Sequence, residues 1–254
     1  MLSKELASWA TAGDALPEAR VAEAADQLAL ALSQGALCGE GGALAEQLAA
    51  LGDDGVQALL VELFSSAGGG RAVGQAACGN LLQVSLLPRL RALQTPAPRS
   101  LLAAALASAA AHPLAAADVL VLELLLGEGA GPIQGDVAAS VAEALPLDVR
   151  PILLRSLCVQ GGVWTEQTCA VAIAATSPRA ALTLNNVVDL AAALKASLAA
   201  APALAGAQRF GKLLQAVTKL DPGILRGAKD ELVALASSGK GLLAKAALAK
   251  MRKL

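Results

Sequence analysis

Residues Arg99 to Leu126 read RSLLAAALASAAAHPLAAADVLVLELLL, and this stretch decides the fold class of the chain. Leucine and alanine recur in it at spacings of three and four residues, which is typical of helices. Proline cannot continue a helix and pushes the preceding residue out of the α region, so the chain should fold back at His112-Pro113. The stretch therefore predicts two antiparallel helices that are apolar on nearly all sides and covered by other helices.

The same alanine- and leucine-rich composition extends along the rest of the chain. Of its 254 residues, 56% are hydrophobic and only 2% are aromatic. Alanine and leucine are strong helix formers, and the alternation of apolar and polar residues that marks strands is absent. The composition predicts an all-α protein whose helices pack closely through small side chains.

Helical segments separated by short breaks recur in pairs along the whole sequence. The period of about 35–40 residues is typical of helical repeat arrays, in which each pair buries its apolar face against its neighbours. We therefore predict a single domain over residues 1–254, an α-solenoid of antiparallel helix pairs similar to HEAT or armadillo repeats. A compact helical bundle is the alternative.

Two local features give sharper expectations. Pro88 is expected to kink or divide a helix over residues 77–93, with Arg89 on the exposed side of that helix. Asn185 or Asn186 is expected to cap a later helix.

A membrane span is not expected, because the longest uncharged stretch is mostly alanine and His112-Pro113 interrupts it.

The charge is divided unevenly. Residues 1–194 hold 18 acidic and nine basic side chains, a net charge of −9, whereas residues 195–254 hold three acidic and 11 basic ones, a net charge of +8. A basic end on an acidic body favours an anionic or acidic partner for that end. The alternative is that the long cationic side chains only solvate an alanine-rich surface.

Catalytic chemistry finds little support in the residues. The cysteines form no CxxC pair, and the single histidine, His112, cannot complete a zinc site with them. No HExxH, GxSxG or DxD motif is present, so we expect no enzyme activity, no metal and no cofactor. An enzyme of an unfamiliar kind is the remaining catalytic hypothesis. The four cysteines, expected to be reduced, are Cys38, Cys78, Cys158 and Cys169.

Five segments follow one another in a definite order along the chain: a Leu-rich hairpin with a proline turn, a Gly-Pro-x-Gln loop that enters a helix, a Trp-x-Glu helix start, a Lys-Leu helix and a closing Ala-Lys helix. They read SLLAAALASAAAHPLAAADVLVLELLL (100–126), GAGPIQGDVAASVAEAL (129–145), VWTEQTCAVAIAA (163–175), RFGKLLQAVTKL (209–220) and GLLAKAALAKMRKL (241–254). In this order they resemble the C-terminal domain of the Fanconi anaemia group E protein family. The resemblance covers residues 80–254, and residues 1–79 fit it only as further helices.

The resemblance implies a non-enzymatic adaptor of the nuclear Fanconi core complex, a ubiquitin-ligase assembly for interstrand crosslink repair. The partners would be the Fanconi anaemia group C protein and the substrate that becomes monoubiquitinated. In the family the C-terminal helices carry substrate recruitment, and the matching residues here are Leu242 and Leu243, beside Lys245. Leu242 stands where the vertebrate member has an aromatic residue, and a smaller apolar anchor can still fill a partner's pocket. Both leucines could instead only close the final repeat.

The basic C-terminal helices also allow a second function, nonspecific binding of nucleic acid. Affinity would then come from phosphate contacts and would fall steeply with salt. Few aromatic side chains are present to stack on bases, so we do not expect specific recognition of single strands. The candidate partner-binding cations are Arg209, Lys212, Arg226, Lys229 and Lys245, and the nucleic-acid hypothesis adds Arg252.

Overall fold

The computed structural model describes residues 18–34, 43–64, 73–160, 162–177 and 181–254. Helices dominate these residues and no β-strand occurs among them, which confirms the prediction of an all-α protein. Among the described helices, none combines the length and apolar character that crossing a bilayer requires. The chain divides into two compact units, one ending at Leu124 and the other beginning at Leu125. Each is described by itself.

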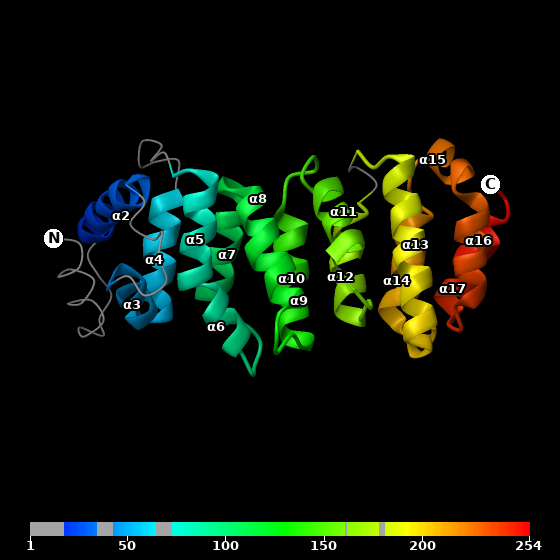
Figure 1. The fold of residues 1–254 in the computed structure, drawn as a ribbon, viewed down its shortest axis with the longest axis horizontal. Helices are drawn as coiled ribbons and strands as arrows, with labels where there is room; N and C mark the ends of the chain where they lie inside the picture. The colour runs from blue at the N-terminus through cyan, green and yellow to red at the C-terminus, as the bar shows by residue number, and fades with distance from the viewer. Residues whose placement is uncertain (1–17, 35–42, 65–72, 161, 178–180) are drawn as a thin grey trace. The chain divides into compact units, whose positions relative to one another are not determined.

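The N-terminal unit contains two rows of helices. In one row α2 packs on α4 and α4 packs on α7, while in the other α3 packs on α5 and α5 packs on α8 and the π-helix η2 (Figure 1). Neighbours in a row are therefore not consecutive in the chain. The elements of this unit are α2 (Glu18–Ser33), α3 (Ala43–Ala50), α4 (Asp53–Phe64), α5 (Gln75–Ser85), α6 (Leu87–Ala92), α7 (Arg99–Ala111), α8 (Pro113–Ala116) and η2 (Ala117–Glu123), followed by α9 (Leu124–Leu126).

The C-terminal unit repeats the two-row arrangement. One row consists of α10, α12, α14 and α17, each packed on the next, and α11, α13 and α16 form the other in the same way (Figure 1). The elements are α10 (Pro132–Ala144), α11 (Arg150–Gln160), α12 (Glu166–Ala175), α13 (Leu184–Ala200), the 3₁₀-helix η3 (Pro202–Gly206), α14 (Gln208–Val217), α15 (Pro222–Gly227), α16 (Lys229–Ser238) and α17 (Leu242–Met251).

The predicted break at His112-Pro113 is confirmed. His112 follows the last residue of α7, and its N–H donates to the carbonyl of Ser108. Its own carbonyl accepts from the N–H of Ala116, the last residue of the short helix α8. Pro113 occupies the first turn of α8, where the missing N–H costs no helical hydrogen bond. The π-helix that follows was not predicted, because nothing in the residue pattern distinguishes it from an α-helix.

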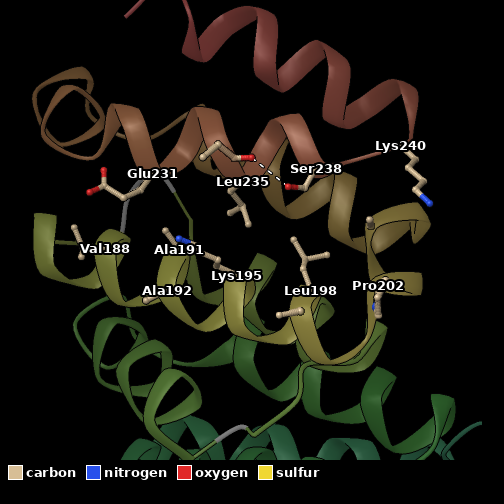
Figure 2. Close-up of a pocket in the computed structure, with 13 residues that line it drawn as sticks. Val188, Ala191, Ala192, Lys195, Leu198, Pro202, Glu231, Leu235, Ser238 and Lys240 are labelled. Atoms are coloured by element: carbon tan, nitrogen blue, oxygen red, sulfur yellow. Dashed lines mark hydrogen bonds between the residues drawn. The ribbon is translucent and has the colours of Figure 1, made fainter.

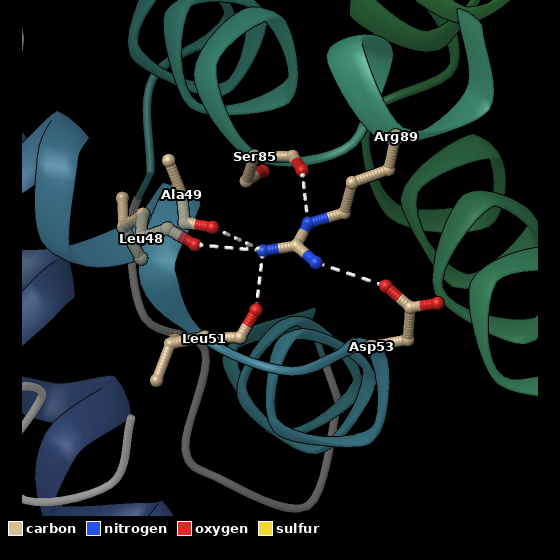
Figure 3. A network of polar contacts seen from close by, with 6 residues as sticks. All are labelled: Leu48, Ala49, Leu51, Asp53, Ser85 and Arg89. Atoms are coloured by element: carbon tan, nitrogen blue, oxygen red, sulfur yellow. Dashed lines mark hydrogen bonds and ion pairs between the residues drawn. The ribbon is translucent and has the colours of Figure 1, made fainter. Parts of the chain in front are cut away.

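Pro88 divides the predicted helix into α5 and α6, but the expected exposure of Arg89 is wrong. The Arg89 side chain is only 16% exposed and donates to the carbonyls of Leu48, Ala49 and Leu51 at the end of α3 (Figure 3). The last carbonyls of a helix have no intrahelical partner and carry its negative dipole end, so a guanidinium suits them.

Two further contacts complete this arginine network. One guanidinium nitrogen of Arg89 lies 2.9 Å from a carboxylate oxygen of Asp53, the first residue of α4. The Nε–H of Arg89 donates to the carbonyl of Ser85 at the end of α5. One side chain therefore joins α3, α4, α5 and α6, and we call this the Arg89 network.

The expected cap at Asn185 or Asn186 is also wrong. Thr183 caps α13, and its hydroxyl accepts from the N–H of Asn186. The Asn186 side chain accepts in return from the Thr183 N–H at 2.9 Å, which closes a capping box. The two residues act together, and Asn186 is the third residue of the helix rather than its cap.

Candidate docking surfaces of the C-terminal unit

Leu242 is the most exposed large hydrophobic residue of the C-terminal unit among the described residues. It is 84% exposed, at the first position of α17. The helix is held in place by other residues, because Ala244, Ala247 and Met251 turn inward and are buried. Leu242 is therefore free to contact a partner without any change in the packing of α17.

Leu243, the neighbouring candidate, is half-buried where α17 crosses α14. A Cβ atom added at Gly211 of α14 would lie 2.9 Å from the Cβ of Leu243, so the two helices approach closely only because position 211 is glycine. Leu243 therefore takes part in packing α17 on α14. The structure thus separates two residues that the sequence placed together.

The candidate cations do not form one cluster. Lys212 and Lys245 are exposed on α14 and α17, two neighbours in one row, whereas Arg226 and Lys229 belong to α15 and α16. Arg226 is exposed and Lys229 is half-buried. Helix α16 packs on α17, so Lys229 lies on an element next to the Leu242 helix.

Arg209 differs from the other candidates because its charge already has a partner. One of its guanidinium nitrogens lies 2.6 Å from a carboxylate oxygen of Asp136 on α10, and the Arg209 side chain is 29% exposed. No ion pair joins Lys212, Arg226 or Lys245 to another described residue. These three side chains therefore offer their charge to solvent, and Arg209 serves mainly to link α14 to α10.

A second surface feature was missed by the sequence analysis. An apolar groove of about 600 Å³ runs between α13 and α16, with η3 at one end (Figure 2). Its floor includes Ala191, Ala205 and Leu235, which are buried. The remaining lining residues are Val188, Ala192, Lys195, Leu198, Ala199, Pro202, Glu231, Ala234, Ser238 and Lys240.

One sequence signal for the groove existed. On α13 the lining residues recur every three or four positions from Val188 to Ala199, as the residues on one face of a helix do. The stripe through Val187, Leu190 and Leu194 is a different one and is buried in the core. Two apolar stripes on one helix indicate that a second partner surface exists, but periodicity does not show which element supplies the other wall.

The cysteine thiols in the described part of the chain show no sign of activation as nucleophiles. Burial raises the pKa of the Cys78 thiol to about 12. Burial and, to a lesser extent, Glu166 raise the pKa of Cys169 to about 12, with Arg209 acting in the opposite direction. Cys38 lies outside the described residues. No three His, Cys, Asp or Glu side chains gather as a metal site in the part of the chain that the structure describes.

Comparisons with known proteins do not identify a family for this chain. No protein-family model matches the chain, and no curated protein matches it.

Proposed function

We propose that the chain is a non-enzymatic adaptor subunit of the nuclear Fanconi anaemia core complex. It would bridge the Fanconi anaemia group C protein and the substrate that is monoubiquitinated in interstrand crosslink repair. Two arguments support this: the five segments that resemble the group E family in order, and the two-row packing inside each unit. Packing of every second helix is what antiparallel pairs in HEAT-like repeats produce, so we propose the solenoid architecture on the same ground.

The exposure of Leu242 is the observation that carries the proposal. Leu242 is 84% exposed, and the residues that hold α17 in the unit are the buried Ala244, Ala247 and Met251, so the Leu242 side chain adds little to the packing of the helix. Interface energy concentrates in a few such anchors, while charged neighbours raise the association rate and orient the partner. Lys245, one turn further along α17, and Lys212 on α14 are the charged neighbours. An acidic substrate surface with an apolar pocket fits this arrangement.

The test is binding of Leu242→Asp to the substrate protein and to the group C protein. We expect at least a tenfold loss of substrate affinity, because an aspartate cannot occupy an apolar pocket, with group C binding and the thermal midpoint unchanged. Val159→Asp is the matched control, since Val159 is 77% exposed on α11 of the same unit. Leu243→Asp is unsuitable, because it would place a charge at the crossing of α14 and α17.

Two outcomes would contradict the proposal. Normal binding of the substrate by a folded Leu242→Asp protein would show that this face is not the docking site. Failure of the wild-type chain to bind either Fanconi protein would remove the adaptor function itself.

Nonspecific nucleic-acid binding is the second candidate, favoured by the exposed and unbridged Lys212, Arg226 and Lys245. It predicts an affinity for duplex DNA that falls steeply with salt and decreases when Lys212 and Lys245 are replaced by glutamine. Absence of retention in a filter-binding titration at low salt would exclude it.

A further inference from the structure

The groove between α13 and α16 has the shape and chemistry of a helix-binding site. Its length can be judged from α13, where ten residues separate Val188 from Leu198, or roughly 15 Å at 1.5 Å per residue. That length matches about three turns of a second helix. The volume of about 600 Å³ is filled by no described residue, and buried alanine and leucine side chains form its floor.

Small residues along both walls allow a backbone to approach closely. Ala192 and Ala199 of α13 and Ala234 of α16 line the groove and are exposed. The end of the groove is fixed by a backbone hydrogen bond, in which the N–H of Lys240 donates to the carbonyl of Ala205 in η3 at 2.9 Å. The groove is therefore preformed, and a ligand would not have to order its walls.

The polar groups of the groove define the ligand that fits it. Figure 2 shows Glu231 at the end near Val188, Lys240 at the opposite end near Pro202, and Lys195 between them. The hydroxyl of Ser238 donates to the carbonyl of Ala234 in its own helix, so it offers little to a ligand. A small polar molecule would find few convergent groups on the apolar floor. An extended apolar ligand with charged groups along its edges could contact the apolar floor and the charged side chains at the same time.

We propose that this groove binds an amphipathic helix of a partner protein, with an apolar stripe against the floor and acidic side chains facing Lys195 and Lys240. The dipole of such a helix sets its direction: the positive N-terminal end lies at Glu231 and the negative C-terminal end at Lys240. Helix-in-groove recognition of this kind uses anchors at positions i, i+3 or i+4, and i+7. Leu242 does not line the groove, and the proposal does not depend on the adaptor function proposed above.

The experiment uses the full chain and two synthetic stapled helices of about three turns. Both carry the same leucine stripe, but glutamates flank it toward the C-terminus in one peptide and lysines replace them in the other. We expect the acidic peptide to bind about threefold to tenfold more tightly than the basic one, as two exposed ion pairs allow. Lys195→Glu/Lys240→Glu should reverse that preference.

A matched pair of variants locates the binding site. Ala192→Trp should fill the groove from an exposed position of α13 and reduce the affinity for the acidic peptide at least tenfold. Ala249→Trp makes the same substitution at an exposed position of α17 and should leave the affinity unchanged. Thermal midpoints of both variants, measured alongside, show that the chain is folded.

Several results would overturn the proposal. Absence of saturable binding of either peptide up to about 1 mM would remove the site. Equal affinity for the two peptides would remove the charge argument, and equal loss in Ala192→Trp and Ala249→Trp would place the peptide elsewhere. Loss of peptide binding in Leu242→Asp would also contradict the proposal, because it would merge the groove with the Leu242 face.

Discussion

The two units use arginine in the same structural way but differ in what their other cations do. Arg89 of the N-terminal unit binds the carbonyls at the end of α3, and Arg150 of the C-terminal unit binds the carbonyls of Glu143 and Leu145 at the end of α10. In the N-terminal unit Arg91 is also engaged, with the Glu123 carbonyl. In the C-terminal unit Lys212 and Lys245 are exposed and join no described residue in an ion pair.

In the N-terminal unit Arg89 and Arg91 bind backbone carbonyls of other elements, whereas the C-terminal unit also exposes lysines to solvent. A guanidinium can bind several carbonyls at once, whereas a lysine ammonium is a compact and strongly hydrated charge. Of the 11 basic residues in 195–254, eight are lysines, and no lysine occurs between Lys4 and Lys195. Lysines therefore supply most of the positive charge that the C-terminal unit exposes.

Replacing Arg89 should have the largest effect. Arg89→Ala leaves four carbonyls and Asp53 without a shared donor, and we expect a loss of about 2–4 kcal/mol of stability. Arg89→Lys should recover less than half, because an ammonium cannot reach all of these oxygens. Lys212→Ala, the control on the displayed side, should stay within about 0.5 kcal/mol in urea unfolding.

The alkylation rates of the buried thiols show whether the loss of stability in Arg89→Ala is confined to one unit. Only a thiolate reacts with an alkylating reagent, so thiols whose pKa is raised to about 12 react mainly after local opening. Arg89→Ala should accelerate alkylation of Cys78 and leave Cys169 nearly unchanged, as read by mass spectrometry. Equal acceleration at both cysteines would show that the two units open together.

Two glycines should respond to alanine with opposite signs. Gly211→Ala brings a new Cβ to 2.9 Å from the Cβ of Leu243, an overpacking that should cost about 1–3 kcal/mol. Gly79→Ala, inside α5 of the N-terminal unit, meets only a Val119 methyl at 4.0 Å and should stabilise by about 0.5–1 kcal/mol. Thermal unfolding of the two variants measures both effects, and equal signs would contradict the close crossing of α14 and α17.

The smallest effect concerns His112, the only histidine of the chain. Its ring packs edge-on against Phe64 with centroids 5.1 Å apart, and burial lowers its pKa below 6.5. On acidification the unfolded chain therefore binds a proton at His112 before the folded chain does. The stability gained from keeping His112 neutral is present above pH 6.5 and is lost as the pH falls through the pKa of the folded state.

His112 is half-exposed, and screening by solvent therefore keeps its pH-dependent contribution to stability small. We expect the wild type to lose a few tenths of a kcal/mol relative to His112→Gln between about pH 7.5 and 5.5. Urea midpoints of the two proteins at each pH measure the difference. A wild type that gained stability relative to the variant on acidification would show that the sign of the pKa shift is wrong.

Local chemistry explains which sequence predictions were correct. The breaks at His112-Pro113 and Pro88 follow from the missing N–H and the ring of proline, whatever the rest of the chain does. The cap of α13 was assigned two or three residues too late, because asparagine serves both as a cap and as the third residue of a capping box. The candidate docking residues stay a prediction: Leu242 is exposed, whereas Leu243 and Arg209 have contacts within the unit.

By itself the sequence determined the helical character of the chain, most of its breaks and the basic character of its C-terminal helices, because these depend on residue type and short-range spacing. Only the tertiary structure decided that Arg89 is enclosed, that Arg209 is paired and that a groove lies between α13 and α16. Arg89 and its carbonyl partners are separated by 38 to 41 residues, and the two groove helices are separated by η3, α14 and α15. Periodicity shows that a helix has a face to cover, but it contains no information on which distant segment covers it or whether that face stays open.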